Sequence, residues 1–503
     1  MAKRLWTTSV LAVVVALLLG ACQATNPSPS PSAPEASAPP AASEAPPASE
    51  APSSSAPPAA GGALPEVPTG YTELDTALGA DKPYNGRRVT IQTQWIAGEG
   101  ANFDAALAPF EEATGIDVVQ ESIASQHEVV LRTRIEGGTP PDLAMLAQPS
   151  AVVEYGGRGQ TTNVASFMDP AKLNQEYSAG FGTALLTGEG GEIWGIPYKV
   201  DVKSTIWYPI KAFEAAGYAV PTTWDELKAL SAKIVADGNG SPWCLGILDG
   251  AATGWIATDW LEDVMLRTAG IDAYNKWITH DLKFDSPEVR AALEVLAEQW
   301  FTEGYVNGGY QAITATDRLE SWDPMFAPDN NWDGFTPGCW MHRQATWLGP
   351  DFFPDVRAGA TESQYVLGED IGIFYLPQID AAQGTPGLGA GDTLMVLKDD
   401  PEARPEIRAV AEYLATPYGL KPWIDIGSAQ SANQTTPAEW YQSYKQQVAA
   451  DIVGNSTSFG FDASDLMPPE ANRAFWDGIT AWIDSGGTET DQFVQSVDAA
   501  WPQ

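Results

Sequence analysis

The sequence contains few of the residues on which most enzymes and metal sites depend. Its three histidines, His127, His280 and His342, are scattered and form no His-Glu-x-x-His pattern, so the sequence predicts no catalytic zinc. No Gly-x-Ser-x-Gly elbow and no phosphate-binding loop is present, and the glycine-rich residues 387–391 lack the third glycine of a dinucleotide-binding turn. We therefore predict no catalytic residue, no metal and no cofactor.

Basic residues are also scarce. The chain has 27 Lys and Arg against 65 Asp and Glu, a formal net charge of -38. Such a surface repels nucleic acid and anionic membranes, so we expect no nucleic-acid partner, and membrane contact only through a lipid anchor. A neutral ligand is the simplest expectation.

Only three cysteines occur in 503 residues, and the first follows an export signal. Lys3 and Arg4 precede an apolar run over residues 10–19, which is shorter than the ~20 residues of a membrane span. Residues 19–22, Leu-Gly-Ala-Cys, are similar to a bacterial lipobox, which implies a diacylglycerol on Cys22 and a place on the outer face of the cytoplasmic membrane. The alternative is an ordinary secretory signal with a chance cysteine.

The two remaining cysteines, Cys244 and Cys339, lie in the exported part of the chain, where thiols oxidise. We predict one disulfide between them. A bond that closes a loop of this size would stabilise the folded protein by at most about 4 to 5 kcal/mol. The alternative is two separate buried thiols.

A low-complexity segment separates the signal from the folded part. Residues 23–68 are almost entirely Pro, Ala, Ser and Glu without hydrophobic periodicity, so they cannot bury enough apolar surface to fold. Largely extended at ~3.1 Å per residue, they would reach on the order of 100 Å from a membrane. This is either a tether of functional length or a plain spacer.

The folded part begins with alternating strand and helix patterns. Strands are expected at residues 88–95, 116–120 and 142–146, with helices at 103–114, capped by Asn102, and at 126–136. This rhythm is typical of a parallel sheet covered by helices, the α/β class.

After residue 193 the pattern changes. Residues 193–208 are aromatic and β-branched and contain Pro197, which favours an extended segment crossing between lobes over a central strand. Helical patterns then dominate, and strand-like residues 371–376 and 393–398 suggest that the chain revisits its first lobe.

Nineteen tryptophans point to sugar recognition, because an indole face packs against the C–H face of a sugar ring while carboxylates bind its hydroxyls. Most tryptophans are nevertheless expected to lie in the core, Trp260 among them.

Residues 329–334 fit the first half of a calcium loop, but Trp340 stands where a bidentate Glu is needed, so a polar surface turn is expected.

The chain resembles the family-1 extracellular solute-binding proteins of ABC importers, in particular those that deliver α-glucosides. This resemblance implies a type II periplasmic-binding-protein-like fold with a ligand cleft between two α/β lobes. It is carried by the lipobox and by residues 88–92, 140–143, 194–204, 222–227, 242–244, 252–255, 259–260, 338–345 and 391–392. The implied boundaries are a signal at 1–21, a tether at 22–85, an N-lobe at 86–200 and 372–425, and a C-lobe at 201–371 and 426–503.

The resemblance also implies ten residues that line the ligand cleft. For Asp201 and Lys203 a salt-bridged hinge strand is an equal alternative, and Asp392 departs from maltose-binding relatives, which often have an aromatic residue there. The ten residues are Trp95, Glu99, Tyr198, Asp201, Lys203, Trp255, Asp259, Trp347, Gly391 and Asp392.

The expected function is therefore that of a monomeric, non-enzymatic receptor that delivers a small oligosaccharide to the permease of an ABC importer. Two alternatives remain open: a receptor for a peptide or another non-sugar solute, and a secreted glycoside hydrolase. A hydrolase needs two carboxyl groups on either side of one glycosidic bond, and their separation cannot be obtained from the sequence.

Overall fold

The computed structural model describes residue 64 and residues 67–177 and 181–502. The predicted signal, the lipidation site Cys22 and nearly all of the low-complexity segment lie outside the described residues. In the part of the chain that is described, no helix has both the length and the apolar composition of a membrane span.

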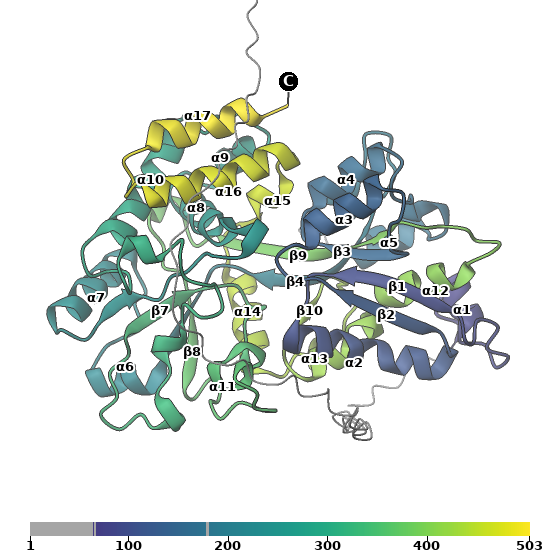
Figure 1. Ribbon diagram of the computed structural model, residues 1–503, viewed down its shortest axis with the longest axis horizontal. Coiled ribbons are helices and arrows are strands. Elements are labelled where there is room, and N and C mark those ends of the chain that lie inside the picture. Colours follow the sequence, from purple (N-terminus) through teal and green to yellow (C-terminus); the bar gives the residue numbers. More distant parts are fainter. Residues whose placement is uncertain (1–63, 65–66, 178–180, 503) are drawn as a thin grey trace, which may run out of the picture. The chain divides into compact units, whose positions relative to one another are not determined.

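The first sheet has seven strands in the order β10-β4-β9-β3-β1-β2, with β11 beside β9. β1, β2 and β3 are parallel, while β9 runs antiparallel to β3 and β4. Helices cover both faces, with α3 and α4 on one side and α2, α12 and α13 on the other (Figure 1). The strands are β1 Arg88–Thr93, β2 Asp117–Ser122, β3 Leu143–Leu146, β4 Ile196–Val202, β9 Gly387–Val396, β10 Gln430–Ser431 and β11 Phe459–Phe461. The helices of this lobe are α1 Thr72–Ala77, α2 Ala97–Thr114, α3 His127–Glu136, α4 Pro149–Gly157, α5 Pro170–Glu176, α12 Pro405–Ala415 and α13 Lys421–Asp425.

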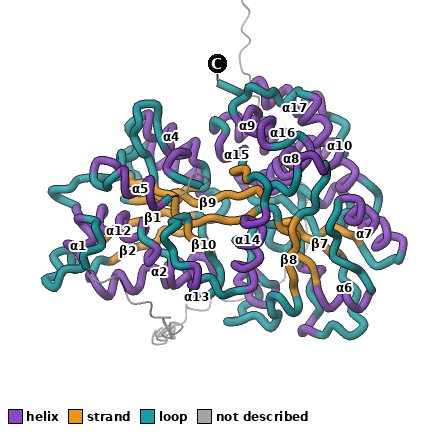
Figure 2. Tube along the Cα trace, turned by 180° about the vertical axis from the view of Figure 1, so that it is seen from behind, coloured by secondary structure: helices purple, strands orange, loops and turns teal. Residues whose placement is uncertain are grey.

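The second sheet has four strands in the order β6-β7-β5-β8, and helices surround it (Figure 2). Its strands are β5 Thr205–Pro209, β6 Ser241–Trp243, β7 Cys339–Arg343 and β8 Ile371–Tyr375. The helices of this second lobe are α6 Ile210–Ala216, α7 Trp224–Ala236, α8 Trp255–Thr268, α9 Ile271–Ile278, α10 Pro287–Phe301, α11 Pro354–Arg357, α14 Tyr444–Asn455, α15 Ala463–Leu466, α16 Pro469–Asp484 and α17 Thr490–Ala500. The two sheets confirm the predicted α/β architecture.

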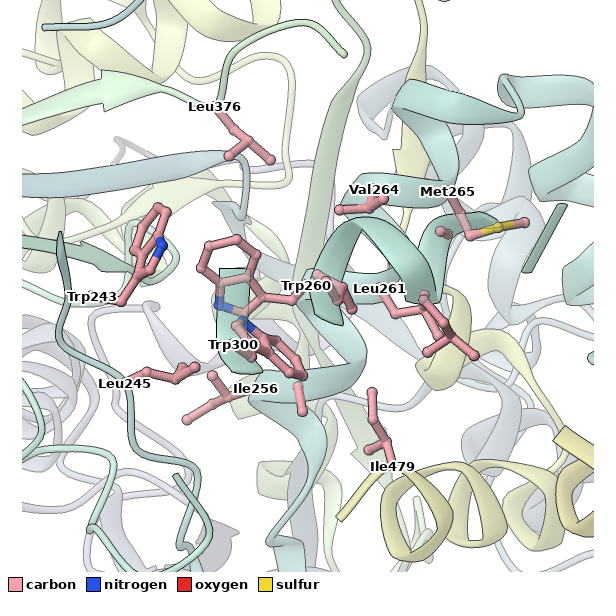
Figure 3. Packing of buried hydrophobic residues seen from close by; sticks show 14 of the residues in the cluster. Trp243, Leu245, Ile256, Trp260, Leu261, Val264, Met265, Trp300, Leu376 and Ile479 are labelled. Carbon is pink, nitrogen blue, oxygen red and sulfur yellow. The ribbon is translucent and has the colours of Figure 1, made fainter. Parts of the chain in front are cut away.

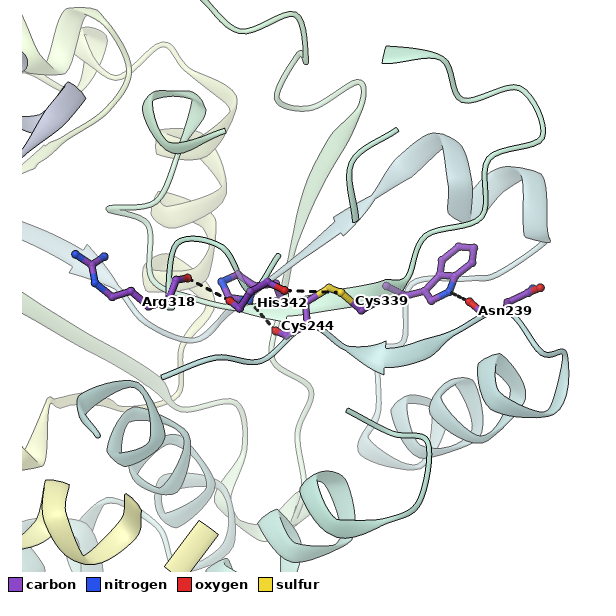
Figure 4. Close-up of a disulfide and its surroundings, with 7 residues drawn as sticks. Asn239, Cys244, Arg318, Cys339 and His342 are labelled. Atoms are coloured by element: carbon purple, nitrogen blue, oxygen red, sulfur yellow. Dashed lines mark hydrogen bonds between the residues drawn. A yellow bond between two sulfur atoms is a disulfide. The ribbon is translucent and has the colours of Figure 1, made fainter. Parts of the chain in front are cut away.

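The disulfide prediction is confirmed. Cys244 follows β6 and Cys339 begins β7, and the bond joins them with a Cα–Cα distance of 5.1 Å (Figure 4). The same strand ends are tied by hydrogen bonds: Nε1 of Trp340 donates to the Asn239 carbonyl at 2.6 Å, and Nδ1 of His342 donates to the Cys244 carbonyl at 2.8 Å. Burial lowers the pKa of His342 to about 4, so its ring is neutral in this site.

Three local predictions were wrong. α2 begins at Ala97, and Asn102 lies inside this helix instead of capping it. Residues 193–208 do cross between the lobes, since β4 lies in the first sheet and β5 in the second, but residues 196–202 form a strand between β10 and β9, and Pro197 is tolerated at an irregularity in the pairing with β9. β8 pairs with β5 in the second sheet, so the chain returns to the first sheet with β9 and not at residue 372.

Most tryptophans do lie in the core, as predicted. Ten of the twelve largest fully buried side chains are tryptophans. Trp260 on α8 lies between Trp243 and Trp300, with ring centroids 4.9 and 6.0 Å away, and aliphatic side chains such as Ile256 and Leu376 surround these rings (Figure 3). The sugar-binding hypothesis therefore depends on the few aromatic side chains that remain accessible.

Candidate functional site

A cavity of about 170 Å³ opens where the two sheets approach each other. The loops that follow β1, β2 and β3 contribute one wall, because the carboxyl ends of parallel strands meet at one edge of a sheet. β4 and β9 form the floor, and α8, α16 and the segments around residues 318 and 347 form the opposite wall. The cavity therefore draws on both lobes.

Eight of the ten residues expected in the cleft line this cavity: Trp95, Glu99, Asp201, Lys203, Trp255, Trp347, Gly391 and Asp392. Tyr198 and Asp259 do not. Tyr198 lies in the core, where its hydroxyl donates to the Gly419 carbonyl at 2.9 Å, and Asp259 is buried behind Lys203. Trp95 offers little surface to a ligand, since it is 2% exposed and packs against Phe103 and Trp423.

Lys199 stands at the centre of the floor, a residue that the sequence interpretation missed. Its Nζ lies 3.2 Å from carboxylate oxygens of Glu99 and Asp201 and 3.7 Å from Asp392. Burial alone would lower the pKa of Lys199, but these three carboxylates raise it well above its usual value. Burial in turn raises the pKa of Asp392 to about 6, although Lys199 opposes this rise. These groups hold one another in place, and the second oxygens of Asp392 and Asp201 accept from Gln94 at 2.5 Å and from Thr346 at 3.2 Å.

Lys203, which directly follows β4, forms a second charged group with two carboxylates. Its Nζ lies 2.7 Å from Asp259 and 2.5 Å from Asp462. Burial would lower the pKa of Lys203, but these carboxylates raise it well above its ordinary value. For Lys203 the alternative of a salt-bridged hinge strand therefore fits the geometry, because its ammonium group ties β4 to α8 and to the start of α15.

Asp259, Glu262 and Asp462 bring three carboxylates within 4.8 Å of one another, but they do not suit a metal ion. Lys203 already neutralises two of them, and Glu262 accepts from the backbone amides of Ala463 and Ser464 at 2.8 and 3.1 Å. Protein donors thus occupy the positions that a cation would need.

The calcium-like segment has the geometry of a surface turn. Asp329 and Asp333 are exposed, and Nδ2 of Asn330 donates to the Gln364 carbonyl at 2.9 Å. Nε1 of Trp332 donates to the side-chain oxygen of the same Asn330. Both polar atoms of the Asn330 side chain therefore form hydrogen bonds within the protein, and these bonds hold the turn in place.

Three indole rings form the opposite wall of the cavity. Trp255 and Trp347 have ring centroids 6.2 Å apart, and both rings are fixed by hydrogen bonds: Nε1 of Trp255 donates to Asp249 at 2.9 Å, and Nε1 of Trp347 donates to Gln344 at 3.1 Å. Arg318 pairs with Asp249 and lies 5.1 Å from the Trp347 ring. The third ring, Trp476 on α16, was missed because nothing in its local sequence separates it from the core tryptophans of that helix.

Two glycines allow segments that build the cavity to pack closely against each other. Gly254, at the N-terminus of α8, has a φ of +116°, and a Cβ there would lie 2.6 Å from the Trp476 carbonyl oxygen. Its missing side chain lets α16 approach the N-terminus of α8 at Trp476. At Gly391 a Cβ would meet Phe181 at 2.3 Å and the Lys199 carbonyl at 2.4 Å. The glycine at 391 is therefore required by packing within the protein, and it also lines the cavity.

The lining of the cavity is strongly acidic. Seven carboxyl groups face three cationic side chains, Lys199, Lys203 and Arg318, and each cation is already ion-paired. The carboxyl groups belong to Glu99, Glu128, Asp201, Asp249, Asp392, Asp462 and Asp465. Flat apolar walls together with many hydrogen-bond acceptors suit a neutral, hydroxyl-rich ligand.

Two known proteins are similar in sequence to this chain over most of its length. The chain is 35% identical over 429 residues to the alpha-glucosides-binding periplasmic protein AglE of Rhizobium meliloti, covering 83% of this chain and 87% of that one. It is 32% identical over 418 residues to the osmoprotective compounds-binding protein GgtB of Synechocystis sp., covering 83% and 93%.

Solved structures share the fold at much lower identity. The bacterial solute receptor AcbH, described as preferring β-D-galactopyranose, superposes with a TM-score of 0.68 at 16% identity, over 82% of this chain and 98% of that one. Maltose-bound MalE3 of T. maritima gives a TM-score of 0.61 at 16% identity, over 82% and 98%. The family model of the bacterial extracellular solute-binding proteins matches residues 95–421, which include β4, β9 and the start of α8 but neither β1 nor α16. On this match and on the two relatives above 30% identity, the chain belongs to the bacterial extracellular solute-binding proteins.

Proposed function

We propose that this protein captures an α-glucoside, or another oligosaccharide that contains glucose, and hands it to the permease of an ABC importer. The observation that carries the proposal is the cavity itself, in which three indole rings stand opposite a floor of carboxylates. An indole face desolvates the C–H face of a sugar, and each carboxylate accepts hydroxyl hydrogen bonds that fix its orientation. The name of AglE supports an α-glucoside in particular.

The charge of the lining supports a neutral sugar. A carboxylate on the ligand would enter a site with seven carboxyl groups and no unpaired cation among the described lining residues, and like charges at such distances repel by several kcal/mol. A glucuronide should therefore bind much more weakly than the matching glucoside.

A receptor for a different solute is the second candidate, and one relative favours it. GgtB is named for osmoprotective compounds, so a small glycoside of another type would also be consistent with this family. A glycoside hydrolase is disfavoured because the carboxylates of the floor are held by Lys199 and Lys203, whereas a general acid must carry a proton to a leaving group.

The site residues, the lobes and the anchor belong to the same proposal. Residues of both sheets contact the sugar. The chain crosses between the lobes from β4 to β5, from β8 to β9, and again around α14 and α15, since β10 and β11 belong to the first sheet. We assign β8 to the C-lobe and take the N-lobe to resume with β9. The protein acts as a monomer, held at the outer face of the cytoplasmic membrane by a lipid on Cys22 and a tether. The tether ends before α1 and not at residue 85 as expected, because Tyr71 and Leu74 are buried in the first lobe.

Isothermal calorimetry of the purified protein tests this function. The panel contains trehalose, sucrose, maltose, isomaltose, the matching glucuronide of one binder and a dipeptide. We expect a neutral α-glucoside to bind with a Kd near 1 μM, about -8 kcal/mol, and to be recovered intact. Binding of the dipeptide alone would overturn the sugar proposal, and release of free glucose would overturn a pure transport role.

A further inference from the structure

A second hollow adjoins the cavity and has about 560 Å³ of space. It lies between α3 and α4 of the first lobe and the start of α16 of the second, and α4 and α16 face each other in both views (Figures 1 and 2). Glu128, Gln148 and Trp476 line both spaces, so the hollow is a continuation of the cavity. We call it the outer groove.

The size of the inner cavity makes this continuation important. Sites for small organic ligands have volumes of roughly 300 to 1,000 Å³. The inner cavity, at about 170 Å³, falls below this range, whereas the inner cavity and the outer groove together fall within it. The outer groove offers a longer ligand room to extend past Trp476.

Two residues that line the outer groove each carry a buried polar atom that no described residue satisfies. Oδ1 of Asn472 and Nε1 of Trp476 have no hydrogen-bond partner in the described part of the chain. Both side chains are more than nine-tenths buried, at 5% and 8% exposure, and both line the outer groove from α16. A buried polar group without a partner costs about 1 to 3 kcal/mol, so a ligand that satisfies it gains affinity. One acceptor and one donor suit hydroxyl groups, which both donate and accept.

The charge of the outer groove also suits a sugar. Three arginines stand against four glutamates, and several of them are paired: Arg158 with Glu154 one helical turn away, and Arg473 with Asp477. The outer groove is thus nearly neutral, unlike the acidic inner cavity. Nothing in it would repel a neutral glycosyl unit or strongly attract an ion.

From this continuity, volume and pair of unsatisfied atoms, we propose that the outer groove is a second glycosyl-binding subsite, which holds the next sugar unit of an oligosaccharide whose first units occupy the inner cavity. This inference rests on the proposed function and adds a length preference to it: the favoured ligand has three or more sugar units. Asn472 is its specificity-determining residue.

Calorimetry with two matched series tests this subsite on the wild-type protein: maltose against maltotriose, and isomaltose against isomaltotriose. In the series that binds, we expect the trisaccharide to bind about tenfold more tightly than the disaccharide. Two new neutral hydrogen bonds at about 1 kcal/mol each, less the ordering of one further ring, give a gain of this size. Equal affinity of both lengths would overturn the subsite while leaving the sugar function intact. Failure of every sugar in the panel would overturn the proposed function instead.

The variant Asn472→Ala assigns the gain to this residue. Trisaccharide affinity should fall about fivefold, the effect of one hydrogen bond, while disaccharide affinity changes less than twofold. Asn275→Ala is the matched control, because Asn275 is an exposed asparagine on α9, away from both spaces, and it should change neither affinity. An equal loss for both sugar lengths in Asn472→Ala would contradict the assignment. If this variant melts early, Asn472→Ser, which keeps a polar side chain of smaller size, should show the same selective loss.

Discussion

At the scale of single residues, recognition depends on the tryptophans that the core leaves accessible. Trp347→Ala and Trp255→Ala should each weaken binding of the sugar by roughly 2 kcal/mol or more, because each removes a flat desolvating surface at the centre of the cavity. Calorimetry of both variants with the best-binding glucoside measures the loss. Trp440→Ala is the control, since Trp440 is half-buried and does not line the cavity. Unchanged affinity in both cavity variants would refute the site.

A second prediction at this scale concerns Asp392. Burial raises its pKa to about 6, above the 3.8 expected when it is unfolded, so this residue favours folding most below pH 4 and loses that contribution as the pH rises through 6. The variant Asp392→Asn has no carboxyl group here and therefore does not lose stability in this way as the pH rises. The free energy of unfolding of the variant, relative to wild type, should therefore rise between pH 4 and pH 7.5, by at most about 3 kcal/mol. Denaturant titrations at both pH values measure it, and a constant difference would contradict it.

The candidate site was predictable where a residue's place in the chain fixes its place in space. Trp95 and Glu99 follow β1 and therefore reach the edge of the sheet, as expected. Tyr198 and Lys199 are neighbours on a strand, so they point to opposite faces, and the sequence alone does not say which face is the cavity. Trp476 could not be predicted, because it reaches the cavity only through the close approach of α16 to Gly254.

At the scale of elements, the contact between α8 and α16 gives a sharp prediction. In Gly254→Ala the new Cβ would have to move away from the Trp476 backbone, which lies 2.6 Å away, and φ would stay at an unfavourable +116°. We expect a loss of about 2 kcal/mol or more in stability and weaker sugar binding. Gly238→Ala is the matched control: its φ is +71°, but a Cβ there meets nothing within 4 Å, so only about 1 kcal/mol should be lost. Equal losses in the two variants would contradict the packing argument.

The disulfide acts on another pair of elements, β6 and β7. Its cysteines are 95 residues apart in sequence, so reduction should lower the unfolding free energy by roughly 2 to 4 kcal/mol through the entropy of the unfolded chain. The double variant Cys244→Ala, Cys339→Ala should still fold and bind sugar, because a large core of tryptophans stands beside the bond. Thermal unfolding with and without reductant measures the effect. Loss of the fold in the double variant would contradict this prediction.

Elements were easier to predict than their pairing. The strand and helix rhythm of residues 88–146 follows from local periodicity, which is why that part of the architecture was confirmed. β8 carries the same apolar pattern as a strand of either sheet, and its partner β5 lies more than 160 residues earlier in the chain. Local sequence contains no information on that choice, so the return of the chain to the first sheet was placed too early.

At the scale of the whole folded part, the cavity is held shut by contacts outside it. Asp351, which does not line the cavity, accepts from Nδ2 of Asn102 on α2 at 2.9 Å and from Oγ of Ser428 at 3.1 Å. A Cβ on Gly98 of α2 would lie 2.5 Å from the Asp351 side chain, so the two segments touch. Asp351 directly follows the segment that carries Trp347, and it thereby joins one wall of the cavity to the other.

Closure of the two lobes should therefore contribute to affinity. If the protein without sugar populates an open form, the apparent Kd equals the intrinsic Kd divided by the closed fraction. Asp351→Ala removes two hydrogen bonds that exist only when the lobes meet, so it should lower that fraction and weaken sugar binding by about 1 to 2 kcal/mol, with the wall tryptophans unchanged. X-ray scattering should show compaction when sugar is added, and a larger change in the variant. Asp333→Ala, at an exposed turn, is the control and should alter neither affinity nor compaction. Unchanged affinity in Asp351→Ala would show that this contact does not govern closure.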